Sequence, residues 1–175
     1  CKVVVIGGGV AGCSSAYHLA KFGWKDTILL ERDVLTSGTT WHAAGLIGQL
    51  GSSATITKLR NYSLNLYKQL ENETGLSTGL KQNGSLTVAT TSDRLEEFKR
   101  QLTFAQRFEI EAMEVNNEQI KDIYPLINTE DLVGGVFIKK DGQADPVGVA
   151  SVLAKAARQN GVKTVSYTHL TLPTK

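Results

Sequence analysis

The sequence is poor in the residues that mark several specialised classes of protein. Its two cysteines, Cys1 and Cys13, are too few for a disulfide framework, and its three histidines form no cluster with other metal-ligating residues. No stretch is apolar enough to span a membrane. Lysine and arginine are scattered along a chain of formal net charge +2, which argues against a nucleic-acid-binding surface. What remains is an ordinary globular composition over 175 residues, enough for a domain with its own core.

Glycine is placed in a specific pattern near the start of the chain. The β-branched run Val3–Ile6 predicts a short strand buried on both faces of a parallel sheet. Gly7, Gly9 and Gly12 follow with the spacing Gly-x-Gly-x-x-Gly. These glycines respectively allow a tight turn, the approach of a pyrophosphate and close helix packing. Because the next helix begins near Val10, its unpaired N–H groups would face the phosphates.

The sequence after the glycines supports a dinucleotide site. A helix that ends near Gly23 is followed by a second expected strand, Thr27–Leu30, and then by Glu31. An acidic residue at this distance is typical of the position that binds ribose hydroxyls. The alternative is a glycine-rich turn in an unrelated α/β fold. We predict an α/β, Rossmann-like dinucleotide-binding fold.

The segment from Arg32 to Gly48 is expected to be a functional loop. It is too rich in glycine, serine and threonine for a helix interior, and its residues do not alternate as in a strand. A long irregular stretch inside a compact domain is usually functional. Leaving the second strand, it would run across a bound cofactor at the carboxyl edge of the sheet.

The rest of the chain is expected to form an inserted α+β layer and then to return to the first sheet. Asp93 and Asp145 are each expected to cap a helix, with Pro146 in the first position of the later one. The expected helices span 54–75, 93–105, 118–123 and 146–160, and the expected strands span 80–89, 112–115, 132–140 and 162–165.

Both ends of the chain carry separate expectations. The chain begins with Cys1 directly before the first strand, which we interpret as a missing N-terminus. Residues 166–175 are interpreted as a translated cloning or sequencing linker, and the alternative is a continuation of the strand at 162–165. On the first interpretation His169 has no functional role.

Several motifs together resemble the dimethylglycine dehydrogenase and sarcosine dehydrogenase family. The most specific is Gly38-Thr-Thr-Trp-His-Ala-Ala-Gly-Leu46, following the glycine turn and Glu31-Arg32. The resemblance extends to about Val162 through Leu70-Glu-Asn-Glu-Thr-Gly75, Asn83-Gly-Ser-Leu86, Tyr124-Pro-Leu126 and Asp141-Gly-Gln-Ala-Asp-Pro146.

The resemblance implies an FAD-dependent amine dehydrogenase with a D-amino-acid-oxidase-like fold. Residues 1–78 and 146–165 would form the FAD-binding domain, 79–145 a substrate-side insertion, and both would be incomplete. By family position, His42 would be bonded covalently to the 8α carbon of the flavin, and Glu31 and Arg32 would bind the ribose. The pyrophosphate turn would comprise Gly7, Gly9, Val10, Ala11 and Gly12, and the loop over the flavin Gly38, Thr39, Thr40, Trp41, His42, Ala43, Ala44, Gly45 and Leu46.

The resemblance also implies a reaction and a cellular setting. The family oxidises N-methyl groups of glycine derivatives, passes electrons to an electron-transfer flavoprotein and works in the mitochondrial matrix of eukaryotes. Its full-length members carry a tetrahydrofolate-binding region downstream. The residues here identify no catalytic base, so the catalytic residues stay unassigned.

Three alternatives stay open at this point. The regulatory subunit of pyruvate dehydrogenase phosphatase resembles the same family but is not an enzyme, and its loop is expected to lack the Trp-His pair found here at Trp41 and His42. An NAD-dependent dehydrogenase would continue with further βα units after the glycine turn. An oxidase that passes electrons to oxygen is not distinguished from a dehydrogenase by these residues. His42 itself has an ordinary alternative, a loop histidine that makes one hydrogen bond.

Overall fold

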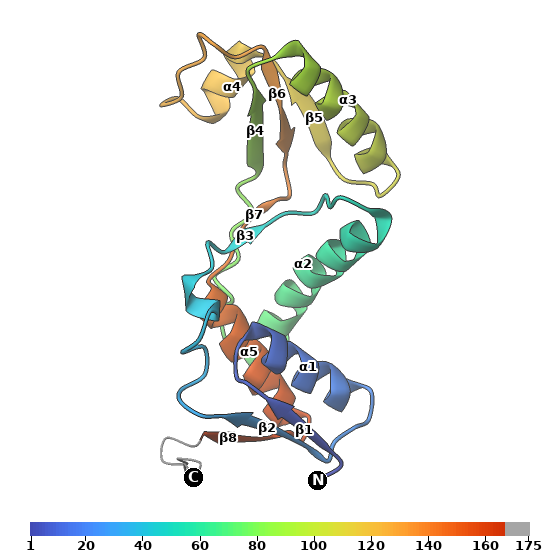
Figure 1. Cartoon of the computed structure of the whole chain (residues 1–175), viewed down its shortest axis with the longest axis vertical. Coiled ribbons are helices and arrows are strands. Elements are labelled where there is room, and N and C mark those ends of the chain that lie inside the picture. Colours follow the sequence, from blue (N-terminus) through green and yellow to red (C-terminus); the bar gives the residue numbers. More distant parts are fainter. Residues whose placement is uncertain (167–175) are drawn as a thin grey trace, which may run out of the picture. The chain divides into compact units, whose positions relative to one another are not determined.

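The computed structural model describes residues 1–166, whose helices and strands are labelled in Figure 1. These residues form two compact units. The first comprises Cys1–Gly45, Asn65–Leu80 and the chain from Ala144 onward, and the second comprises Leu46–Leu64 and Lys81–Gln143. The interpretation of 166–175 as a linker, with His169 inside it, lies outside the described residues except for Ser166, the last residue of a strand.

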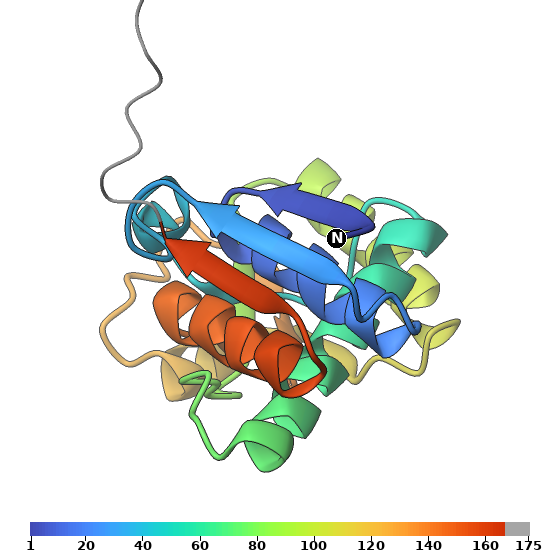
Figure 2. The ribbon, with the colours of Figure 1, turned by 90° about the horizontal axis from the view of Figure 1, so that it is seen from below.

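The first unit is built on a parallel sheet, as predicted. The sheet has the strand order β1-β2-β8, and helices α1 and α5 lie side by side on one of its faces (Figure 2). Both helices carry small, fully buried residues, among them Cys13, Ala16, Ala150 and Ala154, and small side chains allow two packed helices to approach closely. The element bounds are β1 Val3–Ile6, α1 Val10–Lys21, β2 Thr27–Glu31, the short 3₁₀ helix η1 Thr40–His42, α5 Pro146–Gln159 and β8 Lys163–Ser166.

One expectation for this sheet is wrong within the described residues. Strand β1 was expected to be buried on both faces, but Val4 and Ile6 are 48% and 85% exposed. Val3 and Val5, which alternate with them, face the helices and are half-buried. The reason is that, among residues 1–166, helices cover only one face of the sheet, and β1 is an edge strand.

The second unit contains an antiparallel sheet of order β4-β6-β5, with helix α3 packed against it. Phe98 and Ala105 of α3 meet Ala89, Val136 and Ile138 of the sheet in an apolar core. A separate two-stranded pair joins β3 to β7. The bounds are β3 Leu46–Ile47, β4 Ser85–Ala89, α3 Ser92–Gln106, β5 Ala112–Val115, α4 Asn117–Ile123, β6 Gly134–Ile138 and β7 Gly142–Gln143, and the long helix α2, Ala54–Thr74, contributes to both units.

The bounds of the two units differ from the predicted division. Residues 46–64 were expected in the FAD-binding domain with the rest of 1–78, but in the structure they belong to the second compact unit. The cause is local pairing: β3 pairs with β7, and the Asn61 carboxamide accepts a hydrogen bond from Gln49 Nε2 at 2.7 Å. The Arg60 guanidinium also donates to the Leu50 carbonyl. A two-residue strand and side-chain hydrogen bonds leave no periodic pattern in the sequence.

The two predicted helix caps have different outcomes. Asp145 caps α5, accepting a hydrogen bond from the Val147 N–H at 3.0 Å, and Pro146 is the first helical residue. The expectation for Asp93 is wrong, because Thr91 caps α3 through the Arg94 N–H at 3.3 Å. Asp93 lies instead in the first helical turn, where its charge favours the helix dipole.

Candidate functional site

The glycine turn connects β1 to α1 and has room only for glycine at two of its three fingerprint positions. Gly7 has φ of +105°, and its N–H donates to the Leu30 carbonyl at 2.8 Å, which fixes the turn against β2. A Cβ on Gly12 would lie 1.9 Å from the Gly7 carbonyl oxygen, and a Cβ on Gly9 would lie 2.9 Å from Thr40 Oγ1. The turn is therefore tight enough to present the backbone of α1's first turn directly to a ligand.

Two further residues, Leu35 and Cys13, also shape this turn, and the Gly-x-Gly-x-x-Gly spacing did not identify them. A Cβ on Gly8 would lie 2.5 Å from Leu35 Cδ2. The Cys13 thiol is buried and donates to the Gly8 carbonyl at 3.5 Å. Burial raises the pKa of Cys13 to about 11, so the thiol stays protonated and acts as a structural donor.

Glu31 lies at the end of β2 beside the same turn. Its carboxylate accepts hydrogen bonds from the Gly8 N–H at 2.6 Å and the Asp33 N–H at 3.0 Å. The Gly8 hydrogen bond is the main reason that the pKa of Glu31 lies below its usual value, although partial burial acts in the opposite direction. An ionised acceptor is thus held at the carboxyl end of the strand, where ribose hydroxyls bind in such folds. Arg32 follows it and is exposed.

The lowered pKa of Glu31 gives a pH-dependent prediction. A carboxyl whose pKa falls on folding stabilises the folded state above its unfolded pKa, and that stabilisation is lost as the pH falls through the folded value. We expect Glu31→Gln to lower the free energy of unfolding near neutral pH and to have no effect at pH well below the ordinary value of 4.5. Urea unfolding over this pH range measures the difference, and a difference independent of pH would contradict the role of charge.

The loop after β2 is joined to the glycine turn by two hydrogen bonds. The Thr36 N–H donates to the Gly8 carbonyl at 3.0 Å, and Thr36 itself has φ of +72°. Thr40 Oγ1 accepts from the Val10 N–H at 3.0 Å, and the Thr40 side chain is buried. The threonine hydroxyl thus accepts a hydrogen bond from one of the N–H groups that the first turn of α1 leaves unpaired. The N–H groups of Ala11 and Gly12 have no hydrogen-bond acceptor within residues 1–166.

This contact can be tested with a matched pair of threonine variants. Thr40→Val keeps the shape of the side chain but removes the acceptor for the Val10 N–H, so we expect a loss of about 1 kcal/mol of stability. Thr39→Val is the control because Thr39 is exposed. Thermal unfolding measures the effect, and equal melting temperatures of the two variants would show that the hydrogen bond has no role.

Trp41 and His42 follow Thr40 in η1 and face outward. Their ring centroids lie 3.7 Å apart with an interplanar angle of 35°, so the two rings are in contact but tilted relative to each other. Trp41 is 55% exposed, and His42 is exposed as well. Within residues 1–166 neither ring nitrogen of His42 has a hydrogen-bond partner. The imidazole is therefore presented at the surface of the first unit, with its nitrogens available for a bond.

The remaining loop residues fall into two groups. Gly45 has φ of +72°, and a Cβ there would lie 2.2 Å from the Ala144 carbonyl oxygen, so only glycine fits. A Cβ on Gly38 would meet no atom within 4 Å, and Gly38 has no positive φ, so a side chain is sterically allowed there. Thr39, Ala43 and Ala44 are exposed, and Leu46 is 80% exposed in the second unit.

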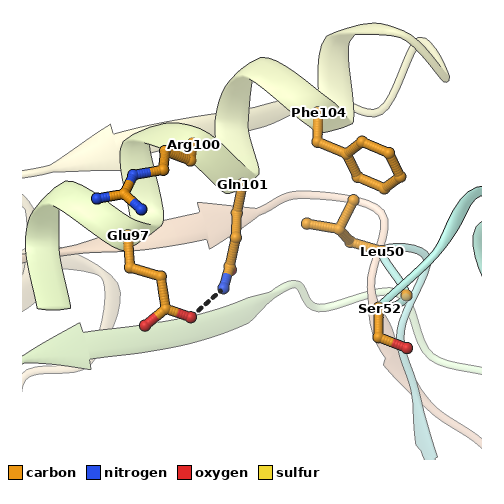
Figure 3. Close-up of a pocket in the computed structure, with 7 residues that line it drawn as sticks. Leu50, Ser52, Glu97, Arg100, Gln101 and Phe104 are labelled. Atoms are coloured by element: carbon orange, nitrogen blue, oxygen red, sulfur yellow. Dashed lines mark hydrogen bonds between the residues drawn. The ribbon is translucent and has the colours of Figure 1, made fainter.

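The described chain offers few other sites for chemistry. A pocket of about 580 Å³ lies between helix α3 and residues 50–52 of the second unit (Figure 3). Its Glu97 carboxylate is engaged by Arg94 and by Gln101 Nε2, at 2.5 and 3.3 Å. Among residues 1–166 there is no group of three or more histidine, cysteine, aspartate or glutamate residues that could hold a metal ion. None of the helices described combines the length and apolarity that a membrane crossing needs.

Comparison with known families gives one match over nearly the whole chain. Residues 2–172 match the DAO family model, described as FAD dependent oxidoreductase. Among solved structures, L-proline dehydrogenase from P. horikoshii superposes with a TM-score of 0.85 at 28% identity, over 94% of this chain and 43% of that one. Glycine oxidase from Bacillus cereus gives a TM-score of 0.76 at 25% identity, over 94% and 47%.

Three curated relatives are similar in sequence. Human mitochondrial sarcosine dehydrogenase is 43% identical over 94% of this chain and 18% of its own length. Rat mitochondrial dimethylglycine dehydrogenase is 42% identical over 92% and 19%. The mouse regulatory subunit of pyruvate dehydrogenase phosphatase is 41% identical over 93% and 18%. The chain therefore spans less than a fifth of the length of these relatives.

Proposed function

Because this chain belongs to the family of FAD-dependent oxidoreductases, we propose that the protein oxidises a secondary or tertiary N-methyl amine, such as sarcosine or dimethylglycine. Bound FAD would supply the chemistry by accepting a hydride from the N-methyl carbon. The observation that carries the proposal is the Thr40–His42 turn. Thr40 is hydrogen-bonded to Val10, the first residue of α1, and the exposed Trp41 and His42 follow it directly.

The residues of the first unit fit FAD. The Ala11 and Gly12 N–H groups at the start of α1 would hold the pyrophosphate, since a Cβ on Gly12 has no room and the helix dipole favours an anion there. The Glu31 carboxylate would accept hydrogen bonds from ribose hydroxyls, next to Arg32. The loop Gly38–Leu46 would cover the flavin.

His42 is proposed as the covalent attachment point, through a ring nitrogen bonded to the 8α carbon of the flavin. A neutral imidazole nitrogen is nucleophilic, and this ring is exposed. The bond would prevent loss of the cofactor. No residue among 1–166 is assigned as a catalytic base. The covalent attachment is supported by the resemblance of the loop and by the free ring nitrogens.

The names of the relatives support a proposed location, and the resemblance of the loop motif supports the proposed partners. Sarcosine and dimethylglycine dehydrogenases with mitochondrial names support a mitochondrial protein. We propose the matrix as its location, an electron-transfer flavoprotein as its electron acceptor, and tetrahydrofolate binding by the part of the protein beyond these residues.

A non-catalytic function is the second candidate, because a phosphatase regulatory subunit is nearly as similar as the dehydrogenases. The two candidates differ in flavin chemistry. We expect sarcosine or dimethylglycine, added without oxygen to the full-length protein, to bleach its flavin absorbance, and glycine, which lacks the N-methyl group, to leave it unchanged. If neither N-methyl amine reduced the flavin, the proposed activity would be wrong.

A further inference from the structure

Asp141 is a buried carboxylate that the proposed function does not yet use. It lies between β6 and β7 in the second unit and is only 4% exposed. Its Oδ1 accepts a hydrogen bond from the Gln49 N–H and its Oδ2 accepts one from the Ser85 hydroxyl, both at 2.7 Å. Removing a carboxylate from water is costly, whereas hydrogen bonds to an ionised acceptor are short and strong.

The bond to Gln49 fixes the segment through which the chain leaves the loop Gly38–Leu46. Directly before Gln49, Leu46 pairs with Gln143 and Ile47 with Gly142 in the antiparallel β3–β7 pair. A Cβ on Gly142 would lie 1.9 Å from the Lys81 carbonyl oxygen, so the backbone on this side is closely packed. Asp141 thus closes the end of a two-residue ladder that is too short to hold its register by itself.

The same row of contacts continues toward the loop within the first unit. The Ala144 N–H donates to the Gly45 carbonyl at 2.8 Å, at the glycine whose positive φ leaves no room for a side chain. Gly45 is therefore held by Ala144 within the first unit, and Leu46 and Ile47 are held by Gly142 and Gln143 within the second. The segment Asp141–Ala144 belongs to the motif Asp141–Pro146, which the sequence analysis used only for the family resemblance and for the start of α5.

The network also reaches helix α2 through Gln49. The Gln49 side chain is buried, and its Nε2 donates to Asn61 Oδ1 at 2.7 Å. Asn61 Nδ2 then donates to the Thr57 carbonyl at 2.9 Å. Gln49 is held from both sides, by Asp141 at its backbone and by α2 at its side chain.

We propose that Asp141 is a positioning residue for the loop that bears His42. Its carboxylate holds the backbone at Gln49, and through the β3–β7 pair it fixes the path of the chain at Leu46 and Ile47. The inference rests on the proposed function, because it assigns the fixed exit to the placement of a flavin-bearing histidine.

Four variants of the full-length protein separate this role from general stability. Asp141→Ala removes both hydrogen bonds. Asp141→Asn still allows both hydrogen bonds, because the amide oxygen can accept from the Gln49 N–H and the amide nitrogen can donate to the Ser85 oxygen. Ser85→Ala removes only the bond to Ser85. Ile120→Ala is the packing control, because Ile120 is fully buried in the second unit and has no part in the network.

Hydrogen exchange of the peptide Ala43–Gly48 is the first readout, since none of its amides bonds to Asp141. We expect about tenfold faster exchange in Asp141→Ala, recovery in Asp141→Asn, and little change in Ser85→Ala. Ile120→Ala should unfold at lower temperature without changing exchange in this peptide. The second readout is the fraction of flavin precipitated with the protein by acid, which should fall several-fold in Asp141→Ala and recover in Asp141→Asn.

The two readouts keep the two proposals separate. If Asp141→Ala behaves like Ile120→Ala in exchange, the positioning role is wrong, whatever the flavin does. If the wild-type protein holds no acid-precipitable flavin, the His42 attachment is wrong, and the exchange comparison still decides the role of Asp141.

Discussion

The His42→Ala protein is expected to contain no acid-precipitable flavin while remaining folded. The His42 ring is exposed, makes no hydrogen bond within residues 1–166 and contacts the Trp41 ring. Its removal should therefore change the free energy of unfolding by no more than about 0.5 kcal/mol, as for other surface substitutions. By contrast, no other side chain of this loop is proposed as an attachment point for the flavin. Flavin should appear in the acid supernatant, or be lost during purification.

The control for this experiment is Trp41→Phe. It keeps His42 and an aromatic neighbour for the imidazole, so the pellet should still carry flavin at the wild-type stoichiometry. Thermal unfolding of both variants checks that they are folded. If the His42→Ala pellet remained yellow and fluorescent, the flavin would be attached elsewhere and the assignment of His42 would be wrong.

Gly12→Ala is expected to abolish FAD binding. The added Cβ would lie 1.9 Å from the Gly7 carbonyl oxygen, far inside contact distance. The start of α1 would have to move away from the turn, which we expect to cost about 3 kcal/mol or more. The movement would also displace the Ala11 and Gly12 N–H groups proposed to hold the pyrophosphate. Both the flavin content and the melting temperature of the full-length protein should fall.

Gly38→Ala is the matched control, because the same substitution meets open space there. This variant should keep wild-type stability. Equal flavin content in Gly12→Ala and wild type would contradict the geometry of the turn. An equal fall of the melting temperature in both variants would show that the loss of stability does not come from the close contact at Gly12.

Local patterns were enough to predict the parts of the site that depend on neighbouring residues. Gly7 and Gly12 were given steric reasons from their spacing, and the structure confirms a positive φ at one and a close backbone contact at the other. Asp145 and Pro146 were correctly placed at the start of α5 because a cap involves only the next few residues. The return of the chain to a parallel sheet at β8 was also predicted correctly.

What the sequence did not reveal depends on residues that are far apart. Thr40 bonds to Val10 across thirty positions, and Asp141 bonds to Gln49 across 92. Neither contact leaves a periodic signal, since each involves a single side chain in an irregular segment. The two-residue β3–β7 pair is also too short to detect, so residues 46–64 were expected together with the rest of 1–78, whereas in the structure they cluster with the second unit. Asp93 was expected to cap α3, whereas Thr91, two positions earlier, offers an equivalent oxygen and is the cap.

Acid precipitation of the full-length wild-type protein tests the central claim most directly. We predict flavin fluorescence in the washed pellet at about one FAD per chain, released neither by acid nor by denaturant. Flavin found wholly in the supernatant would contradict covalent attachment at His42. Absence of flavin from both fractions would contradict FAD binding itself and would favour the regulatory-subunit alternative.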